Sequence, residues 1–195
     1  MLETIPVESL QTAVYRLASY REDEEFMDRL GLDQEGQYEL MNLLESQNAN
    51  DSVEALLDGP FRPKPRLKKT GYSVSRFSDG SFPVFYCATE AETAKAEVRH
   101  HRTESVSDEF STRYTLFRCD FDGSVKDLRR KKAEWSELTY GTDYRFCNEL
   151  GFEAVKTGLD GLLAPSVRRV GGTNIPVFKR SAISNPRDLE EVTDP

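Results

Sequence analysis

The segment SFPVFYCA (Ser81–Ala88) constrains the fold more than any other part of the 195-residue sequence, because it is apolar at nearly every position. In a β-strand, successive side chains point to opposite faces of the sheet. The apolar side chains therefore divide into two sets: Phe82, Val84 and Tyr86 on one face, Phe85 and Cys87 on the other. Such a strand must be covered on both sides, and Pro83, which lacks an N–H donor, is expected at its beginning.

Turn residues and hydrophobic periodicity divide the rest of the chain into short strands and helices. Further strands are expected at residues 12–19, 113–121, 124–128, 161–165 and 171–178. Helices are expected at residues 21–31, 33–46, 51–59, 90–101 and 144–156. Strands and helices mixed in this way predict an α+β fold, and the length suits a single domain over residues 1–195.

Charge is distributed unevenly along the chain. The formal net charge is −8, yet residues 1–60 hold 14 acidic and 3 basic residues, whereas residues 61–195 hold 20 acidic and 23 basic. We interpret residues 21–59 as an acidic helical insertion or lid, and residues 60–69, which contain three prolines, as a stiff basic connector without secondary structure. The role of the insertion stays open between contact with a partner protein and an ordinary solvated surface.

Composition excludes several classes of function. No dense basic stripe interleaves with aromatic residues, which disfavours direct binding to nucleic acid, while the mildly basic remainder suits a small anionic ligand. The cysteines are three widely spaced residues, predicted to be reduced and structural: Cys87, Cys119 and Cys147. No spacing fits a metal site, and no apolar run approaches the length of a membrane span. We therefore expect a cytoplasmic protein without metal or membrane contacts.

The segment TEAE (residues 89–92) has the pattern of a capping box and predicts that a helix begins at Glu90. On a helical wheel, three small or apolar residues share the side that would pack on the sheet: Ala91, Ala94 and Val98. Glu97 lies at the border of that side, so its carboxylate could reach a cleft. Helix geometry alone is equally typical of a surface glutamate.

Further polar residues recur at intervals around this helix: Arg76, Tyr86, Ser166 and Asn174. The segments RF…PVFYCATEAETAKAE…H and GLLAPSVRRVGGTNIPVF resemble the RES domain, a family named for its arginine, glutamate and serine. The resemblance extends over about residues 12–180, and the spacing of these residues is more specific than any single motif. The acidic segment 21–59 departs from compact members of the family, so no family role is transferred to it.

The resemblance implies both a fold and a reaction. RES proteins are mostly bacterial toxins of toxin–antitoxin pairs, with a fold like that of ADP-ribosyltransferases, and they consume NAD⁺. For this chain it implies an ADP-ribosyltransferase-like mixed sheet and an NAD⁺ glycohydrolase or NAD⁺ phosphorylase. NAD⁺ would be a consumed substrate, with no cofactor. The implied partner is a cognate antitoxin, which could form an oligomer with the toxin.

Cleavage of the nicotinamide–ribose bond moves positive charge onto the ribose, and a nearby carboxylate stabilises that charge. The resemblance implies Glu97 for this task, with Arg76 and Tyr86 as the other catalytic residues. Arg76 would bind the pyrophosphate, and Arg16 is a weaker candidate for the same role. Tyr86 offers an aromatic face or a hydroxyl group to the substrate. The remaining candidates for NAD⁺ binding are two short polar residues: Ser166 and Asn174.

Each candidate also has an ordinary structural explanation. An arginine is usually a surface ion pair, a tyrosine on a central strand usually belongs to the core, and a serine or asparagine near a turn usually stabilises the turn. The sequence therefore leaves two other functions open, a protein ADP-ribosyltransferase and a non-catalytic interaction module. Water, phosphate or a protein could each be the acceptor.

Overall fold

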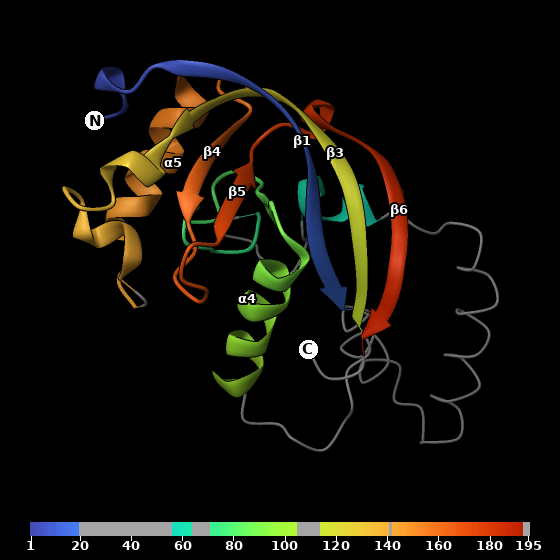
Figure 1. The fold of residues 1–195 in the computed structure, drawn as a ribbon. Helices are drawn as coiled ribbons and strands as arrows, with labels where there is room; N and C mark the ends of the chain where they lie inside the picture. The colour runs from blue at the N-terminus through green and yellow to red at the C-terminus, as the bar shows by residue number, and fades with distance from the viewer. Residues whose placement is uncertain (20–55, 64–70, 105–113, 141, 193–195) are drawn as a thin grey trace.

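The computed structural model describes residues 1–19, 56–63, 71–104, 114–140 and 142–192 (Figure 1). These residues form the strands β1 (Val7–Ser19), β2 (Phe85–Ala88), β3 (Tyr114–Asp127), β4 (Gly161–Pro165), β5 (Thr173–Val177) and β6 (Ile183–Val192). The helices are α4 (Ala91–Glu104) and α5 (Arg145–Lys156), with the 3-10 helices η1 (Leu2–Thr4), η3 (Gly59–Phe61), η4 (Leu128–Lys131), η5 (Ser136–Thr139) and η6 (Arg180–Ala182). The predicted α+β class is therefore confirmed.

The sheet closes on itself, because β3 pairs with strands on both of its sides. Along β1 it pairs antiparallel from Val7↔Lys126 to Ser19↔Tyr114, and at its other edge it pairs with β4 in parallel. The strand order β1-β2-β5-β4-β3 thus returns to β1, with β6 added beside β3. Figure 1 shows β1, β3 and β6 as long curved strands lying side by side. Between β1 and β2 the ladder consists of one pair, Tyr15↔Ala88, so the sheet is weakest at this seam.

Strand β2 is covered on both faces, as its sequence predicts. Phe85 and Cys87 are buried in the core enclosed by the sheet, together with Phe117 from β3. Tyr86 packs on the opposite face against the cluster that contains Leu150 of α5. The strand begins at Phe85 instead of residue 81, so the prolyl residue expected at its start precedes it.

Helix α4 packs as predicted but begins differently. Ala94 is buried, and the partly buried Ala91 and Val98 pack on the same cluster of sheet residues. The predicted capping box is wrong, because the Thr89 amide and hydroxyl both donate to the carbonyl of Thr173, at 3.0 and 3.5 Å. The helix therefore begins at Ala91, and pairing with β5 takes the group expected to cap it.

Strand β1 begins at Val7 instead of residue 12, and two further parts of the sheet differ from the prediction. The segments 113–121 and 124–128 form a single continuous strand, β3, because β1 pairs with it through the predicted break at Asp122 and Gly123. Strand β6 was not predicted, since its sequence ISNPRDLEEV is polar and contains Pro186. It lies at the edge of the sheet, where a proline and charged side chains are tolerated.

The predicted helices at 21–31 and 33–46 lie outside the described residues, as does most of the helix at 51–59. Its last turn is described: residues 56–58 are helical, and Leu57 is fully buried in the core. The connector prediction is wrong at its start, because residues 60 and 61 belong to η3, and Phe61 stacks on Phe85 with ring centroids 6.3 Å apart. Among the described residues, no helix is long and apolar enough to cross a membrane.

Candidate active site

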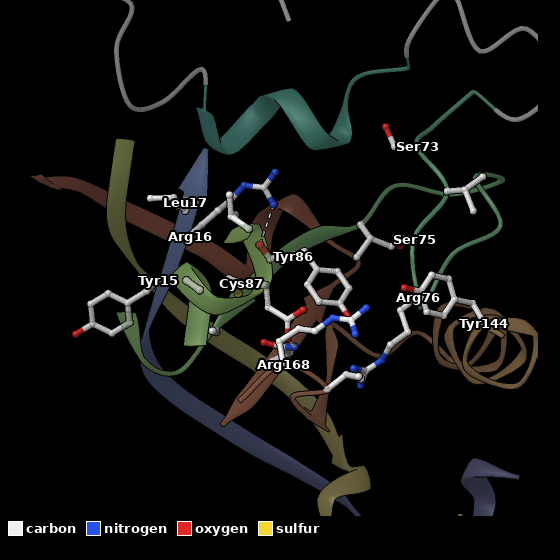
Figure 2. A pocket seen from close by; sticks show the side chains of 18 residues that line it. Tyr15, Arg16, Leu17, Ser73, Ser75, Arg76, Tyr86, Cys87, Tyr144 and Arg168 are labelled. Carbon is white, nitrogen blue, oxygen red and sulfur yellow. Dashed lines mark hydrogen bonds between the residues drawn. The ribbon is translucent and has the colours of Figure 1, made fainter. Parts of the chain in front are cut away.

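A cavity of about 340 Å³ lies where β1 and β2 separate, at the weakest seam of the sheet. Its walls come from β1, β2, the middle of α4, the segment 73–76 and the loop that joins β4 to β5. Figure 2 shows Arg16, Tyr86, Arg76, Tyr144 and Arg168 around this space. A cavity of this size is in the range that binds small molecules.

Glu97 projects from α4 into the cavity, and its carboxylate is held from behind. Its Oε1 accepts a hydrogen bond of 2.7 Å from the Ser166 hydroxyl and one of 2.6 Å from the Asn174 side-chain amide. Both donors are buried, and they come from the ends of the neighbouring strands β4 and β5. Among the described residues no hydrogen bond reaches Oε2 of Glu97, so this oxygen remains for a ligand.

The direction of the Ser166–Glu97 hydrogen bond is fixed by the backbone. The Ser166 oxygen accepts from the amides of Arg168 and Arg169, at 3.1 and 3.0 Å. With its acceptor sites taken, the hydroxyl can only direct its proton toward Glu97. Ser166 therefore has both roles: its oxygen stabilises the turn that follows, as an ordinary serine would, and its proton is donated to the Glu97 carboxylate.

Arg76 is buried at the opposite side of the cavity. Its guanidinium lies 4.8 Å from the centre of the Phe77 ring, and Nη2 donates to the Pro165 carbonyl at 2.9 Å. The segment that carries it is held by Asn148 of α5, whose amide donates to the carbonyls of Ser75 and Arg76, both at 2.9 Å. Arg76 is thus no surface ion pair, because a ring face and a carbonyl orient it.

Arg16 and Tyr86 face the cavity from the two strands of the seam. Arg16 Nη1 donates to the Tyr86 carbonyl at 2.8 Å, a bond that joins β1 to β2 beside their single ladder pair (Figure 2). The Arg16 guanidinium also lies 4.8 Å from the centre of the Phe85 ring. Burial, with a smaller contribution from Glu97, raises the pKa of Tyr86 well above its ordinary value, although Arg76 opposes the shift. The Tyr86 hydroxyl is therefore neutral and able to donate.

The structure brings the predicted site residues together. Five of them line one cavity: Glu97, Arg76, Tyr86, Asn174 and Arg16. Ser166 lies directly behind Glu97. Their roles in NAD⁺ binding and cleavage stay predictions, because no contact with a substrate is described.

A model of the RES domain family matches residues 50–194. The chain belongs to the RES domain family. The predicted family is therefore confirmed, although the match begins at residue 50, whereas the predicted resemblance began near residue 12. Strand β1, which supplies Arg16 to the cavity, lies outside the matched range.

The fold of this RES protein resembles that of a solved structure titled "Crystal structure of the M.tuberculosis MbcT-MbcA toxin-antitoxin complex". The TM-score is 0.54 at 17% sequence identity, and the alignment covers 94% of this chain and 86% of that chain. It therefore includes residues before position 50, and the likeness concerns the fold. A search of curated protein sequences gives no match.

Three of the residues that sequence reasoning missed in this RES domain have a clear role in supporting or lining the cavity. Tyr144, at the N-cap of α5, lines it, and Asn148 orients the segment of Arg76. A Cβ atom at Gly151 would overlap the Phe77 carbonyl, so glycine allows this close approach. A signal was present, because asparagine and glycine are both unfavourable inside a helix and therefore suggest a specific contact.

The cysteines of the RES domain are free and buried. Burial raises the pKa of Cys87, which lines the cavity, and of Cys147, where Arg76 opposes the shift. Neither is therefore a thiolate nucleophile near neutral pH. Among the residues that the structure describes, no three His, Cys, Asp or Glu side chains are grouped so that they could hold a metal ion.

Proposed function

We propose that this RES protein is a toxin-type enzyme that degrades NAD⁺ by cleaving its nicotinamide–ribose bond. NAD⁺ is its substrate, and either water or phosphate takes the ADP-ribosyl group, which makes the protein an NAD⁺ glycohydrolase or NAD⁺ phosphorylase. One observation carries the proposal: the Glu97 carboxylate faces a cavity while Ser166 and Asn174 hold its Oε1. A carboxylate fixed in this way is suited to stabilise the positive charge that develops on the ribose during cleavage.

The leaving nicotinamide departs as a neutral base, and the ribose carbon that it leaves becomes electron-deficient. Glu97 would stabilise this carbon, either directly or by accepting a hydrogen bond from a ribose hydroxyl at its Oε2 atom. Because Ser166 and Asn174 are neutral donors, they orient the carboxylate without cancelling its charge. The carboxylate is therefore oriented before the substrate binds, and no reorganisation of this side chain is needed at the moment of bond cleavage.

Arg76 and Arg16 would bind the pyrophosphate of NAD⁺. Each guanidinium lies over a phenyl ring and donates to a backbone carbonyl, both of which are neutral partners. The charge of Arg76 therefore remains available to an anionic ligand, and Arg16 faces the same cavity. Tyr86, which stays protonated because burial raises its pKa, would offer its ring to the nicotinamide or its hydroxyl to a ribose.

Several further parts of the proposal rest on family membership and on the likeness to a chain of a toxin–antitoxin complex. They are an ADP-ribosyltransferase-like sheet in one domain over residues 1–195, a cytoplasmic location, and neutralisation by a cognate antitoxin. Residues 21–59 would be a helical insertion beside the cavity that contacts this partner. Its described end supports a packed insertion, because Leu57 is buried and Asp58 pairs with Arg180 at 2.6 Å.

Incubation of the purified protein with NAD⁺, with and without phosphate, tests the reaction. Free nicotinamide together with ADP-ribose indicates a glycohydrolase, and a phosphorylated ADP-ribose that forms only with phosphate indicates a phosphorylase. Radiolabel transferred from NAD⁺ to a protein would instead indicate an ADP-ribosyltransferase. An unchanged NAD⁺ pool would contradict the enzyme proposal and leave a non-catalytic interaction module.

Expression in a bacterial host tests the toxin proposal separately. The wild-type chain should arrest growth and lower cellular NAD⁺, whereas the Glu97→Gln variant should do neither. Co-expression of the protein encoded by the neighbouring reading frame should restore growth if that protein is the antitoxin. Normal growth with an active enzyme and depleted NAD⁺ would contradict the toxin proposal.

A further inference from the structure

Two adjacent arginines in the loop between β4 and β5, residues 166–172, point in different directions. Arg168 lines the cavity, and among the described residues it forms no ion pair. Arg169 instead reaches the first turn of α4, where its Nη1 forms an ion pair with Glu90 and a hydrogen bond of 3.0 Å with the Thr93 hydroxyl. The two adjacent arginines can therefore have different roles, because one side chain faces the cavity and the other faces α4.

The loop is closed and fits tightly on the helix. The Ser166 amide donates to the Gly172 carbonyl at 2.8 Å, and the Gly172 amide donates to the Arg169 carbonyl at 3.0 Å. Gly172 also lies against the buried Thr93, since a Cβ atom at position 172 would be 2.7 Å from the Thr93 hydroxyl oxygen. Any movement of this loop away from α4 would therefore break the Arg169 contacts as well as the hydrogen bond from Ser166 to Glu97.

Arg169 is connected to Glu97 through two routes. Its amide is one of the two backbone donors that orient the Ser166 hydroxyl, and its side chain holds the loop to the helix that carries Glu97. We propose that Arg169 is a positioning residue, whose contacts with Glu90 and Thr93 keep the Ser166 hydroxyl directed at Glu97. This inference deepens the proposed function and rests on it for every measurement of turnover.

The exposure of the ion pair indicates that its effect is local. The side chains of Arg169 and Glu90 are 40% and 50% exposed, and pairs this exposed contribute little to the stability of a whole domain. Losing the pair should therefore leave the fold intact but allow the loop to sample positions in which Ser166 no longer reaches Glu97. The expected result is a lower kcat with little change in KM or in thermal stability.

The matched pair Arg169→Gln and Arg168→Gln tests this separation. Arg169→Gln should lower kcat about ten-fold with KM changed by less than about two-fold, since Glu97 acts in the transition state. Arg168→Gln removes the same charge from the next position and should mainly raise KM, because Arg168 faces the cavity. A kcat for Arg169→Gln equal to that of the wild type would overturn the proposal.

Charge reversal gives a second kinetic test. Glu90→Arg and Arg169→Glu should each lower kcat, and the double variant should recover most of the loss, because the ion pair is rebuilt with opposite polarity. Failure of the double variant to recover kcat, in a protein that folds and binds NAD⁺, would contradict the role of the pair.

Amide hydrogen exchange tests the positioning without any turnover. In Arg169→Gln, exchange at the Arg168 and Arg169 amides should increase, whereas exchange in β3 should not. Unchanged exchange at both amides would overturn the positioning role. If the wild type does not cleave NAD⁺, the proposed function fails, yet this measurement still decides whether Arg169 holds the loop.

Discussion

Glu97 and Arg76 face the same cavity, but the chain holds their charges in different ways. The carboxylate of Glu97 is fixed through one oxygen by two side-chain donors, at 2.7 and 2.6 Å. The guanidinium of Arg76 lies over the Phe77 ring and donates to a backbone carbonyl. Glu97 is thus fixed by two hydrogen bonds to one carboxylate oxygen. Arg76 is fixed by a ring face and, among the described residues, by a single hydrogen bond, which leaves most of its N–H donors available to a ligand.

The two arrangements share one property, which is that their partners are neutral. Among the described residues, Glu97 forms no ion pair with any of the arginines that line the cavity. Opposite charges in one cavity would ordinarily pair and cancel each other's effect on a ligand. Their separation keeps a negative and a positive region apart, which suits a substrate with a developing cation at one end and a pyrophosphate at the other.

This separation carries a cost in stability. Arg76 Nε and Asn174 Oδ1 are both buried without a hydrogen-bond partner among the described residues. Unsatisfied buried polar atoms are rare in folded proteins and cost about 1–3 kcal/mol each. Both residues line the cavity, so this cost falls on the region to which the proposed function assigns NAD⁺ binding.

The first prediction removes the negative charge of Glu97 and has the largest expected effect. Glu97→Gln keeps the shape of the side chain but removes the charge that offsets the ribose cation, so nicotinamide release should fall about 1,000-fold. Because the substitution removes an unpaired charge, the thermal midpoint should stay the same or rise. Wild-type turnover by Glu97→Gln would show that the charge of this carboxylate is not needed for cleavage.

The second prediction removes the positive charge of Arg76. Arg76→Ala should weaken NAD⁺ affinity about 10- to 100-fold, because a charge-assisted contact with phosphate exists in both the ground state and the transition state. Calorimetry in the inactive Glu97→Gln background measures this affinity without turnover. Arg76→Lys is the control, since it keeps the positive charge but loses the planar guanidinium. Its NAD⁺ affinity should lie between those of the wild type and Arg76→Ala. Unchanged affinity in Arg76→Ala would remove Arg76 from the binding site.

The third prediction sharpens the role of the donors behind Glu97. Ser166→Ala should lower kcat about ten-fold with little change in KM, because the carboxylate loses one of its two fixed donors. Ser78→Ala is a matched control: Ser78 is also buried, and its hydroxyl donates to the Phe82 carbonyl at 2.8 Å, away from the cavity. Both variants should lose about 1 kcal/mol of stability. An equal loss of kcat in both would show that Ser166 matters only for folding.

The sequence predicted the parts of the site that depend on local pattern. The apolar segment around Tyr86 and the helical spacing around Glu97 were enough to place a covered strand and a helix with a glutamate at its border. What local pattern could not show was that the ends of β4 and β5 lie next to that helix. The family resemblance supplied this, because Ser166 and Asn174 follow Glu97 by 69 and 77 positions.

The errors have a common physical cause, which is that tertiary pairing overrides local preference. Thr89 was expected to cap α4, but pairing with Thr173 of β5 uses its amide and hydroxyl. The segment around Gly123 was expected to break a strand, but the full-length pairing with β1 continues through it. Strand β6 has a polar sequence and forms because it pairs with β3. In each case the deciding partner is distant in the sequence.

The last prediction concerns Asp127, a carboxylate outside the cavity. Among the described residues, it forms an ion pair with an arginine, unlike Glu97. Asp127 is buried and accepts hydrogen bonds from Arg129, with both N–O distances at 2.9 Å. Burial alone would raise the pKa of Asp127, but the hydrogen bonds from Arg129 outweigh it and hold this pKa below its ordinary value. The carboxylate therefore stabilises the fold above the ordinary pKa of an aspartate, and this contribution is lost as the pH falls through the lower folded value.

Asp127→Asn should accordingly cost about 2 kcal/mol of unfolding free energy near neutral pH, and this cost should shrink at an acid pH below the ordinary pKa of an aspartate. Urea unfolding of both proteins at the two pH values measures the difference. Turnover at neutral pH should change by less than about three-fold, the smallest effect of the series, since Asp127 does not line the cavity. A cost that is equal at both pH values would show that packing, and not the paired charge, is what Asp127 contributes. Arg129 also donates to the Thr173 hydroxyl at 3.4 Å, and Thr173 precedes Asn174 in β5. A large loss of kcat would therefore mean that the Asp127–Arg129 ion pair affects Glu97 through this contact, and that the paired and unpaired carboxylates are not independent.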